Sequence, residues 1–180
     1  MTDSPLSAAR SNVTELSRIV EALDPVVLDE VVHTIARASR VFFTGVGRSG
    51  LVARAIAMRL MHVGIPTFAV GEIATPGIEA GDLLVAVTSS GRGSVLQQAR
   101  TANEIGADVL VVTAAPESGI VELASIALIL PARTEVPTQQ HAGSLFEQAA
   151  LVVGDALLHS VQQRLRVPSA ELDRRHANLA

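Results

Sequence analysis

Short runs of aliphatic and β-branched residues alternate along the chain with longer segments whose apolar residues recur at helical spacing. The short runs predict five buried strands, at residues 41–44, 67–70, 83–88, 109–113 and 126–130. The segments between them predict helices at 51–62, 94–104 and 119–124, with glycine or proline at the joints. This alternation is typical of βαβ units. It predicts an α/β fold, a three-layer αβα sandwich around a five-stranded parallel sheet of the flavodoxin-like kind.

Helical segments flank the predicted sheet in the sequence. Residues 6–23 and 25–38 predict an N-terminal helical pair that is interrupted at Asp24-Pro25, since proline suits the first turn of a helix. A polar loop at 131–143 precedes a long helix predicted over about 144–166, and an arginine-containing tail follows at 169–180. We expect one domain over 1–180, with N-terminal helices at 1–38, the core at 39–131 and the C-terminal helix and tail at 142–180.

The composition removes several classes of chemistry. All 14 basic residues are arginine, and the chain contains no lysine and no cysteine. Schiff-base chemistry, a Walker-type phosphate loop and thiolate nucleophiles or zinc sites are therefore excluded. Any catalysis must use histidine, carboxylates, hydroxyls, arginine or backbone amides.

Charge and hydropathy narrow the expected partners. The formal net charge is -4 and the only aromatic residues are 4 Phe, so no nucleic-acid partner is expected. Because 48% of the residues are hydrophobic and 18% charged, we expect subunit contacts to cover part of the surface. The most apolar helical segment, 142–161, contains Glu147, Asp155 and His159, so it predicts a buried helix and not a membrane span. With no targeting segment visible, the sequence predicts a soluble cytoplasmic protein without a membrane partner.

Two loops rich in glycine and hydroxyl groups follow predicted strands. They are GVGRSG at 45–50 and TSSGRGS at 88–94, and each leads into a predicted helix at the edge where open α/β sheets bind ligands. The first matches the GxGxxG dinucleotide fingerprint, and Glu72 lies about 22 residues beyond Gly50, so spacing alone leaves a dinucleotide open. Two such loops suit a phosphate monoester better. The same residue types also form turns and caps where no ligand binds.

The pair of loops resembles the SIS, or sugar isomerase, domain. Further segments are AMRLMHVG at 57–64, VGEIATPG at 70–77, LFEQAAL at 145–151 and RRHANL at 174–179. Together with GVGRSG and SSGR at 89–92, they are similar to 6-phospho-3-hexuloisomerases over nearly the whole chain. The resemblance implies interconversion of D-arabino-hex-3-ulose 6-phosphate and D-fructose 6-phosphate in the ribulose monophosphate pathway of formaldehyde fixation. It also implies a homotetramer and a functional link to hexulose-6-phosphate synthase.

The resemblance also implies a phosphate and substrate site in the two loops. Its expected members are Gly47, Ser49, Thr88, Ser89, Ser90 and Ser94. The second loop is one residue shorter than in many relatives, so Ser94 either supplies a missing hydroxyl or caps its helix. Arg48 is expected to pair with the phosphate or a sugar oxygen, and Glu72 to hold Arg48 or a sugar hydroxyl. For Arg48 and Glu72, a structural ion pair is the alternative.

The implied catalytic pair is Glu147 and His176. Moving a carbonyl from C3 to C2 through a cis-enediol needs one group for the carbon-bound proton and another for the oxygens. No histidine pair shows metal-ligand spacing and polar donors can stabilise an enediolate, so neither metal nor cofactor is expected. Without the resemblance, Glu147 would be a glutamate that complements a helix dipole, and His176 a solvated terminal histidine. The resemblance makes Glu147 the base and implies a tail that packs over a neighbouring subunit's site, while the sequence leaves open whether His176 acts in its own subunit or in the neighbouring one.

Three other functions remain possible from the residues. One is another SIS aldose-ketose isomerase, and another is a non-catalytic SIS module that senses phosphosugars. The third is a dinucleotide-binding subunit. Arg59 and His62 lie well along a predicted helix, so packing or subunit contact is expected for them. A surface or interface position is expected for His141, with an approach of its loop to the site as the alternative.

Overall fold

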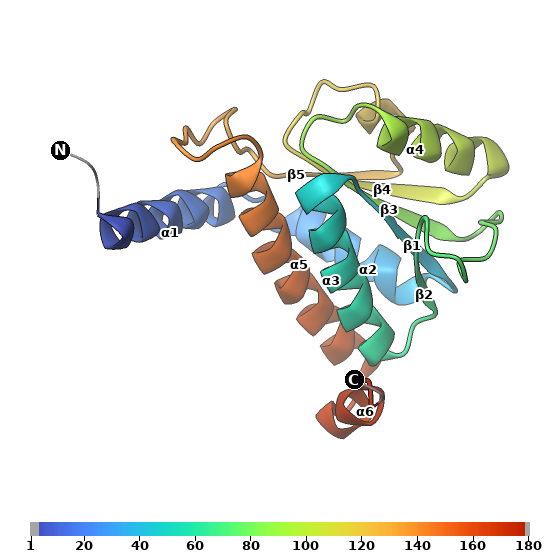
Figure 1. The fold of residues 1–180 in the computed structure, drawn as a ribbon. Coiled ribbons are helices and arrows are strands. Elements are labelled where there is room, and N and C mark those ends of the chain that lie inside the picture. The colour runs from blue at the N-terminus through green and yellow to red at the C-terminus, as the bar shows by residue number, and fades with distance from the viewer. Residues whose placement is uncertain (1–3, 179–180) are drawn as a thin grey trace.

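The chain forms a five-stranded parallel sheet covered by helices on both faces, here described for residues 4–178 of a computed structural model (Figure 1). The sheet has the order β2-β1-β3-β4-β5. Every neighbouring pair is parallel, which confirms the predicted fold class. The strands are β1 (Val41–Thr44), β2 (Thr67–Ala69), β3 (Leu83–Thr88), β4 (Asp108–Thr113) and β5 (Ile126–Ile129).

Four helices cover one face of the sheet and one helix covers the other. α2, α3 and α5, with the end of α1, pack against alternate strand residues such as Phe43 and Val85. α4 packs on the opposite face against Phe42 and Leu84. None of the helices described is both long and apolar enough to cross a membrane. The helices are α1 (Pro5–Glu21), α2 (Pro25–Arg37), α3 (Gly47–Val63), α4 (Ser94–Ile105), α5 (Ser144–Leu165) and α6 (Ser169–Arg174).

Two elements differ from the sequence prediction. α3 begins at Gly47 and not at residue 51, because the Gly50 N–H already donates to the Val46 carbonyl. The predicted helix at 119–124 is only a 3-10 turn, η1 (Val121–Leu123). Its backbone hydrogen bonds span three residues, and β5 begins at Ile126, which leaves no room for an α-helix. The earlier start of α3 places Arg48 and Ser49 in the first turn of a helix.

α3 and α5 lie side by side and run in the same direction (Figure 1). Near their starts Arg48 pairs with Glu147, and further along Arg59 Nε lies 3.8 Å from Asp155 Oδ1. Between these pairs, a Cβ added to Gly154 would lie 2.5 Å from Ile56 Cδ1. The absence of a side chain at Gly154 therefore sets how closely the two helices approach.

Candidate active site

Three helices begin at the carboxyl edge of the sheet without a side-chain cap. Their N-cap residues are Val46 for α3, Gly93 for α4 and Gly143 for α5, and none of them makes a side-chain cap hydrogen bond. By contrast, Ser4 and Asp24 cap α1 and α2 with their side chains. Uncapped helix N-termini present backbone N–H groups and a positive dipole end, which favours an anion.

The first loop is tightly packed by a pair of glycines. A Cβ added to Gly50 would lie 2.5 Å from the Gly45 carbonyl oxygen, so the turn from β1 into α3 closes only with glycine at this position. Gly47, with φ 61, opens α3 in the left-handed region. On this turn Ser49 is buried and Arg48 is exposed. The turn thus directs a guanidinium outward from the edge of the sheet.

A buried carboxylate stands beside this turn. Glu147 Oε2, in the first turn of α5, accepts a hydrogen bond from Arg48 Nε. The Glu147 side chain is 11% exposed and that of Arg48 65%. A Cβ added to Gly143 would lie 3.4 Å from Glu147 Oε1 and 3.6 Å from Ser89 Oγ. Arg48, Ser89 and Glu147, predicted from three separate motifs, therefore meet at one place.

The hydroxyls of the second loop have different environments. Thr88 is buried, and its Oγ1 accepts a hydrogen bond of 3.1 Å from the Gly91 N–H, so this hydroxyl holds the turn. Ser89 is half-buried, whereas Ser90 and Ser94 are exposed. Over residues 4–178, no hydrogen bond engages the hydroxyls of these three serines. Their hydroxyls can therefore donate to a ligand.

A pocket opens beside Gly143, between the loops that follow β3, β4 and β5. Among its lining residues are Ser89, Ala114, Arg133, Thr134 and Phe146. In the same described range, no cluster of three histidine or carboxylate side chains is placed to hold a metal ion. The pocket is therefore lined by a serine, a threonine, an arginine and apolar side chains next to the Glu147 carboxylate.

The loop at 131–143 is held in place by a buried glutamate that the motifs did not reveal. Glu15 Oε2 on α1 accepts hydrogen bonds from Thr138 Oγ1 (2.6 Å) and Gln140 Nε2 (2.9 Å). Burial raises the pKa of Glu15, but these hydrogen bonds outweigh burial and leave the pKa below its ordinary value. Glu15 lies four residues before the buried Ile19, so helical spacing could have placed it on the inner face of α1.

Glu72 does not contact Arg48, so that part of the prediction is wrong. Its Oε1 lies 3.1 Å from Nε of Arg54, and both side chains are exposed. The reason is geometric: Arg48 turns toward the start of α5, and Arg54, further along α3, faces the loop that contains Glu72. A contact between Glu72 and a sugar hydroxyl stays a prediction.

His176 lies at the other end of α3 from Arg48. Its ring stacks on His62, with 5.1 Å between the ring centroids. Positions 48 and 62 of a helix are separated by about 21 Å at 1.5 Å per residue. The structure therefore does not bring His176 to the Glu147 of its own chain.

Comparison with known proteins identifies a domain family whose matched region includes this edge of the sheet. The model of the SIS domain matches residues 34–160, which include both loops, Arg48 and Glu147. The chain belongs to the SIS domain family. This match covers β1 to β5 and most of α5, so the SIS architecture includes the whole sheet and the helices that position the Arg48–Glu147 pair.

Relatives within the SIS family are similar to the chain over most of its length. It is 40% identical to the 3-hexulose-6-phosphate isomerase of Mycobacterium gastri, over 97% of this chain and 89% of the relative. It is 37% identical to the 3-hexulose-6-phosphate isomerase of Methanocaldococcus jannaschii, over 84% of this chain and 83% of the relative. Among solved structures, a hypothetical protein from Methanococcus jannaschii has an inferred molecular function of 3-hexulose-6-phosphate isomerase. It superposes on this chain with a TM-score of 0.84 at 33% identity, over 97% of this chain and 98% of that protein. These relatives confirm the resemblance found in the motifs, and they confirm that the chain is an isomerase.

Proposed function

We propose that this chain interconverts D-arabino-hex-3-ulose 6-phosphate and D-fructose 6-phosphate through a cis-enediol, without a metal. The observation that carries the proposal is the buried Glu147 carboxylate, which lies beside Ser89 and Arg48 at an edge of uncapped helices. The names of the relatives supply the substrate. The proposed setting is the ribulose monophosphate pathway in the cytoplasm, next to a hexulose-6-phosphate synthase.

The substrate phosphate is proposed to bind between the two glycine-containing loops. Ser49 and the N-terminus of α3 lie on one side, and Ser89, Ser90, Ser94 and the N-terminus of α4 on the other. Serine hydroxyls and backbone amides donate to a dianion, and both helix dipoles favour it. Thr88 acts indirectly in this arrangement, because its hydroxyl shapes the turn.

Glu147 is proposed to move the carbon-bound proton. It takes the proton from C2 of the 3-ketose while O3 gains a proton, which gives the 2,3-enediol. The same carboxyl group then returns a proton to C3 while O2 loses one, and the carbonyl forms at C2. The Arg48 side chain is exposed, so it can leave Glu147 and donate a hydrogen bond to the substrate oxygen on which negative charge develops.

His176 is proposed to exchange the oxygen protons from a second copy of the chain. About 21 Å of α3 separates it from its own site. The outer face of α3 exposes Leu51 (66%), Met58 (50%) and Met61 (38%), which a neighbouring subunit would cover. Two α3 helices packed antiparallel would bury these side chains and place each His176 near the partner's Arg48.

Further apolar surface supports the proposed tetramer. α1 projects from the body of the molecule (Figure 1) and exposes Leu6, Val13 and Val20, at a spacing of seven residues. That spacing gives one apolar stripe along a helix and suits packing against another helix. A second contact through α1 would join two α3-linked dimers.

A coupled assay tests the proposed function. Hexulose 6-phosphate is generated from formaldehyde and ribulose 5-phosphate by a synthase, and fructose 6-phosphate is measured. Wild type should form it, and Glu147→Gln should be slower by about 10²–10⁴, the range that a general base contributes. Sugar-phosphate binding should persist in this variant. Glu21→Gln, on the exposed face of α1, is the matched control.

The two negative outcomes have separate meanings. If wild type forms no fructose 6-phosphate, the proposed reaction is wrong. If Glu147→Gln turns over at the wild-type rate, the reaction stands and a different group moves the carbon-bound proton.

A further inference from the structure

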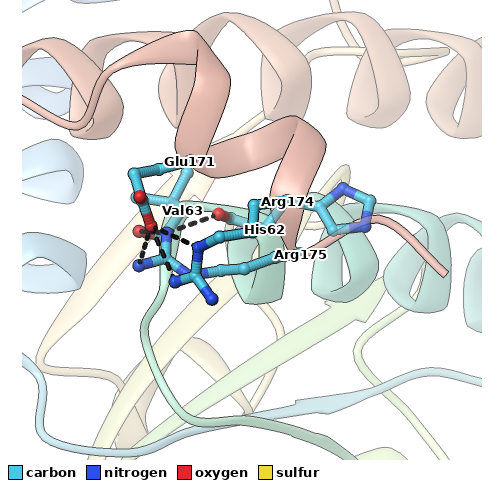
Figure 2. Close-up of polar contacts among 5 residues, drawn as sticks. All are labelled: His62, Val63, Glu171, Arg174 and Arg175. Carbon is cyan, nitrogen blue, oxygen red and sulfur yellow. Dashed lines mark hydrogen bonds and ion pairs between the residues drawn. The ribbon is translucent and has the colours of Figure 1, made fainter. Parts of the chain in front are cut away.

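The chain's tail is anchored on the C-terminal end of α3 (Figure 2). Arg175 Nη1 donates hydrogen bonds to the carbonyl oxygens of His62 (3.0 Å) and Val63 (3.2 Å). The last carbonyls of a helix lack partners within the helix, and a cation there also complements the dipole. Arg175 is thus a side-chain cap for α3, supplied from a segment more than a hundred residues further along the chain.

The end of α3 is shaped to receive this guanidinium. Gly64 follows the helix with φ +107, and a Cβ added to it would lie 2.9 Å from Arg175 Cζ. Any other residue at 64 would be strained and would also fill the space that Arg175 occupies. On the other side, Glu171 Oε2 lies 3.3 Å from Arg175 Nη2 and 2.8 Å from Arg174 Nη2. Arg175 is therefore held between α3 and α6.

The residue after this arginine is His176. Its exposed ring stacks on His62 with 5.1 Å between centroids and 25° between planes. His62 is only 4% exposed, so its buried ring offers a fixed surface to His176. Burial lowers the pKa of His62, and the neighbouring His176 and Arg59 lower it further. The His62 ring is consequently neutral at neutral pH and does not repel a second imidazole.

We propose that Arg175 is a positioning residue for the isomerisation, which fixes His176 on His62 by capping α3. The inference rests on the proposed role of His176 at the site of a second copy. It also gives the AMRLMHVG motif a purpose: His62 is the surface on which His176 stacks, and Gly64 leaves room for Arg175.

Two neighbouring arginines allow a matched test. Arg175→Ala removes the contacts with α3, whereas Arg174→Ala removes an arginine whose polar partner, among residues 4–178, is Glu171. In the coupled assay, Arg175→Ala should lower kcat about tenfold while KM stays within about twofold, because a displaced acid/base group costs rate and the phosphate contacts persist. Arg174→Ala should match wild type, and Arg175→Lys should recover part of kcat.

A spectroscopic measurement reports the anchor directly. A nuclear Overhauser contact between the rings of His62 and His176 should be present in wild type and in Arg174→Ala, and lost in Arg175→Ala. Wild-type kcat in Arg175→Ala, with His176→Ala inactive, would overturn the positioning role and leave the proposed function intact. Retention of the ring contact in Arg175→Ala would overturn it equally. An inactive wild type would remove the proposed function and this inference with it.

Discussion

Thr88 and Ser89 are neighbours with similar chemistry, yet they have different environments. The Thr88 hydroxyl is buried and accepts from the Gly91 N–H within its own turn. The Ser89 hydroxyl lies beside Gly143 and the Glu147 carboxylate, which belong to a distant part of the chain. A motif predicts which loop binds phosphate, but the packing against that loop decides which of its hydroxyls can face a ligand.

Ser90→Ala should weaken substrate binding. Ser90 is exposed close to the uncapped start of α4, and a hydrogen bond to a charged group contributes about 1.5–3 kcal/mol. We expect KM to rise about tenfold or more, measured in the coupled assay. Ser144→Ala is the control, since the Ser144 hydroxyl already donates to the His141 carbonyl at 2.8 Å. An unchanged KM in Ser90→Ala would contradict the phosphate assignment.

The motifs predicted individual residues for the site, but they did not predict the partners of those residues. Arg48 and Glu147 were both expected at the site, but 99 residues separate them, and only the packing of α3 on α5 pairs them. Glu72 was expected near Arg48 because both follow strands at one edge. Its actual partner is Arg54, because the turn of α3 that carries Arg54 faces the loop that contains Glu72.

At the scale of elements, strands were easier to predict than helix starts. β1 and β3 are buried along their whole length, and such strands appear in a sequence as unbroken apolar runs. α3 starts inside GVGRSG, a segment whose glycines indicate a loop, because a glycine can also enter a helix through the left-handed region. Arg48 therefore belongs to a helix, where the sequence indicates a loop.

The connection between α1 and the loop at 131–143 should contribute to stability through Glu15. Glu15→Ala removes the acceptor of two hydrogen bonds, and we expect the free energy of unfolding to fall by about 1–3 kcal/mol at neutral pH. The pKa of Glu15 is lowered in the folded chain, so its contribution is fully present above the ordinary value of 4.5. It should be lost as pH falls through the lower folded value.

Urea unfolding at a series of pH values measures this contribution. The difference between wild type and Glu15→Ala should shrink as the solution becomes acidic. Glu21→Ala controls for the loss of charge on α1, because Glu21 is an exposed acid on the same helix whose carboxylate accepts a hydrogen bond from Ser17 Oγ of the preceding turn. If wild type and Glu15→Ala have the same free energy of unfolding at neutral pH, Glu15 does not stabilise the loop.

At the scale of the whole molecule, the apolar excess in the composition now has a location. It lies on exposed faces of α1, α3 and α5, where α5 exposes Leu151, Val152 and Leu165, and Ile73 adds to it in the loop after β2. Composition predicted that subunits cover apolar surface, but it could not indicate which helices carry it. That depends on the face each helix turns toward the sheet.

Sites shared between subunits should show complementation. Glu147→Gln and His176→Ala proteins should each be inactive, yet their co-expressed mixture should regain about a quarter of wild-type activity. The reason is that a chain with intact Glu147 meets a neighbour with intact His176 at about one site in four. The coupled assay measures the recovery.

A double variant is the control for this experiment. Co-expression of Glu147→Gln with the Glu147→Gln, His176→Ala chain leaves no site with both groups and should stay inactive. If the two single variants fail to complement while a mixed oligomer forms, His176 does not serve a neighbouring site.

Gly154 links the interior of the protein to its chemistry. It meets Ile56 in the middle of the contact between α3 and α5, and about 10 Å further along the same pair of helices lie Arg48 and Glu147. A methyl group added there would lie 2.5 Å from Ile56 Cδ1, and any separation of the two helices that relieved this overlap would widen the gap between guanidinium and carboxylate. Turnover can therefore be sensitive to a residue that never meets the sugar. Loss of activity by a stable variant of this chain does not by itself identify a residue that touches the substrate.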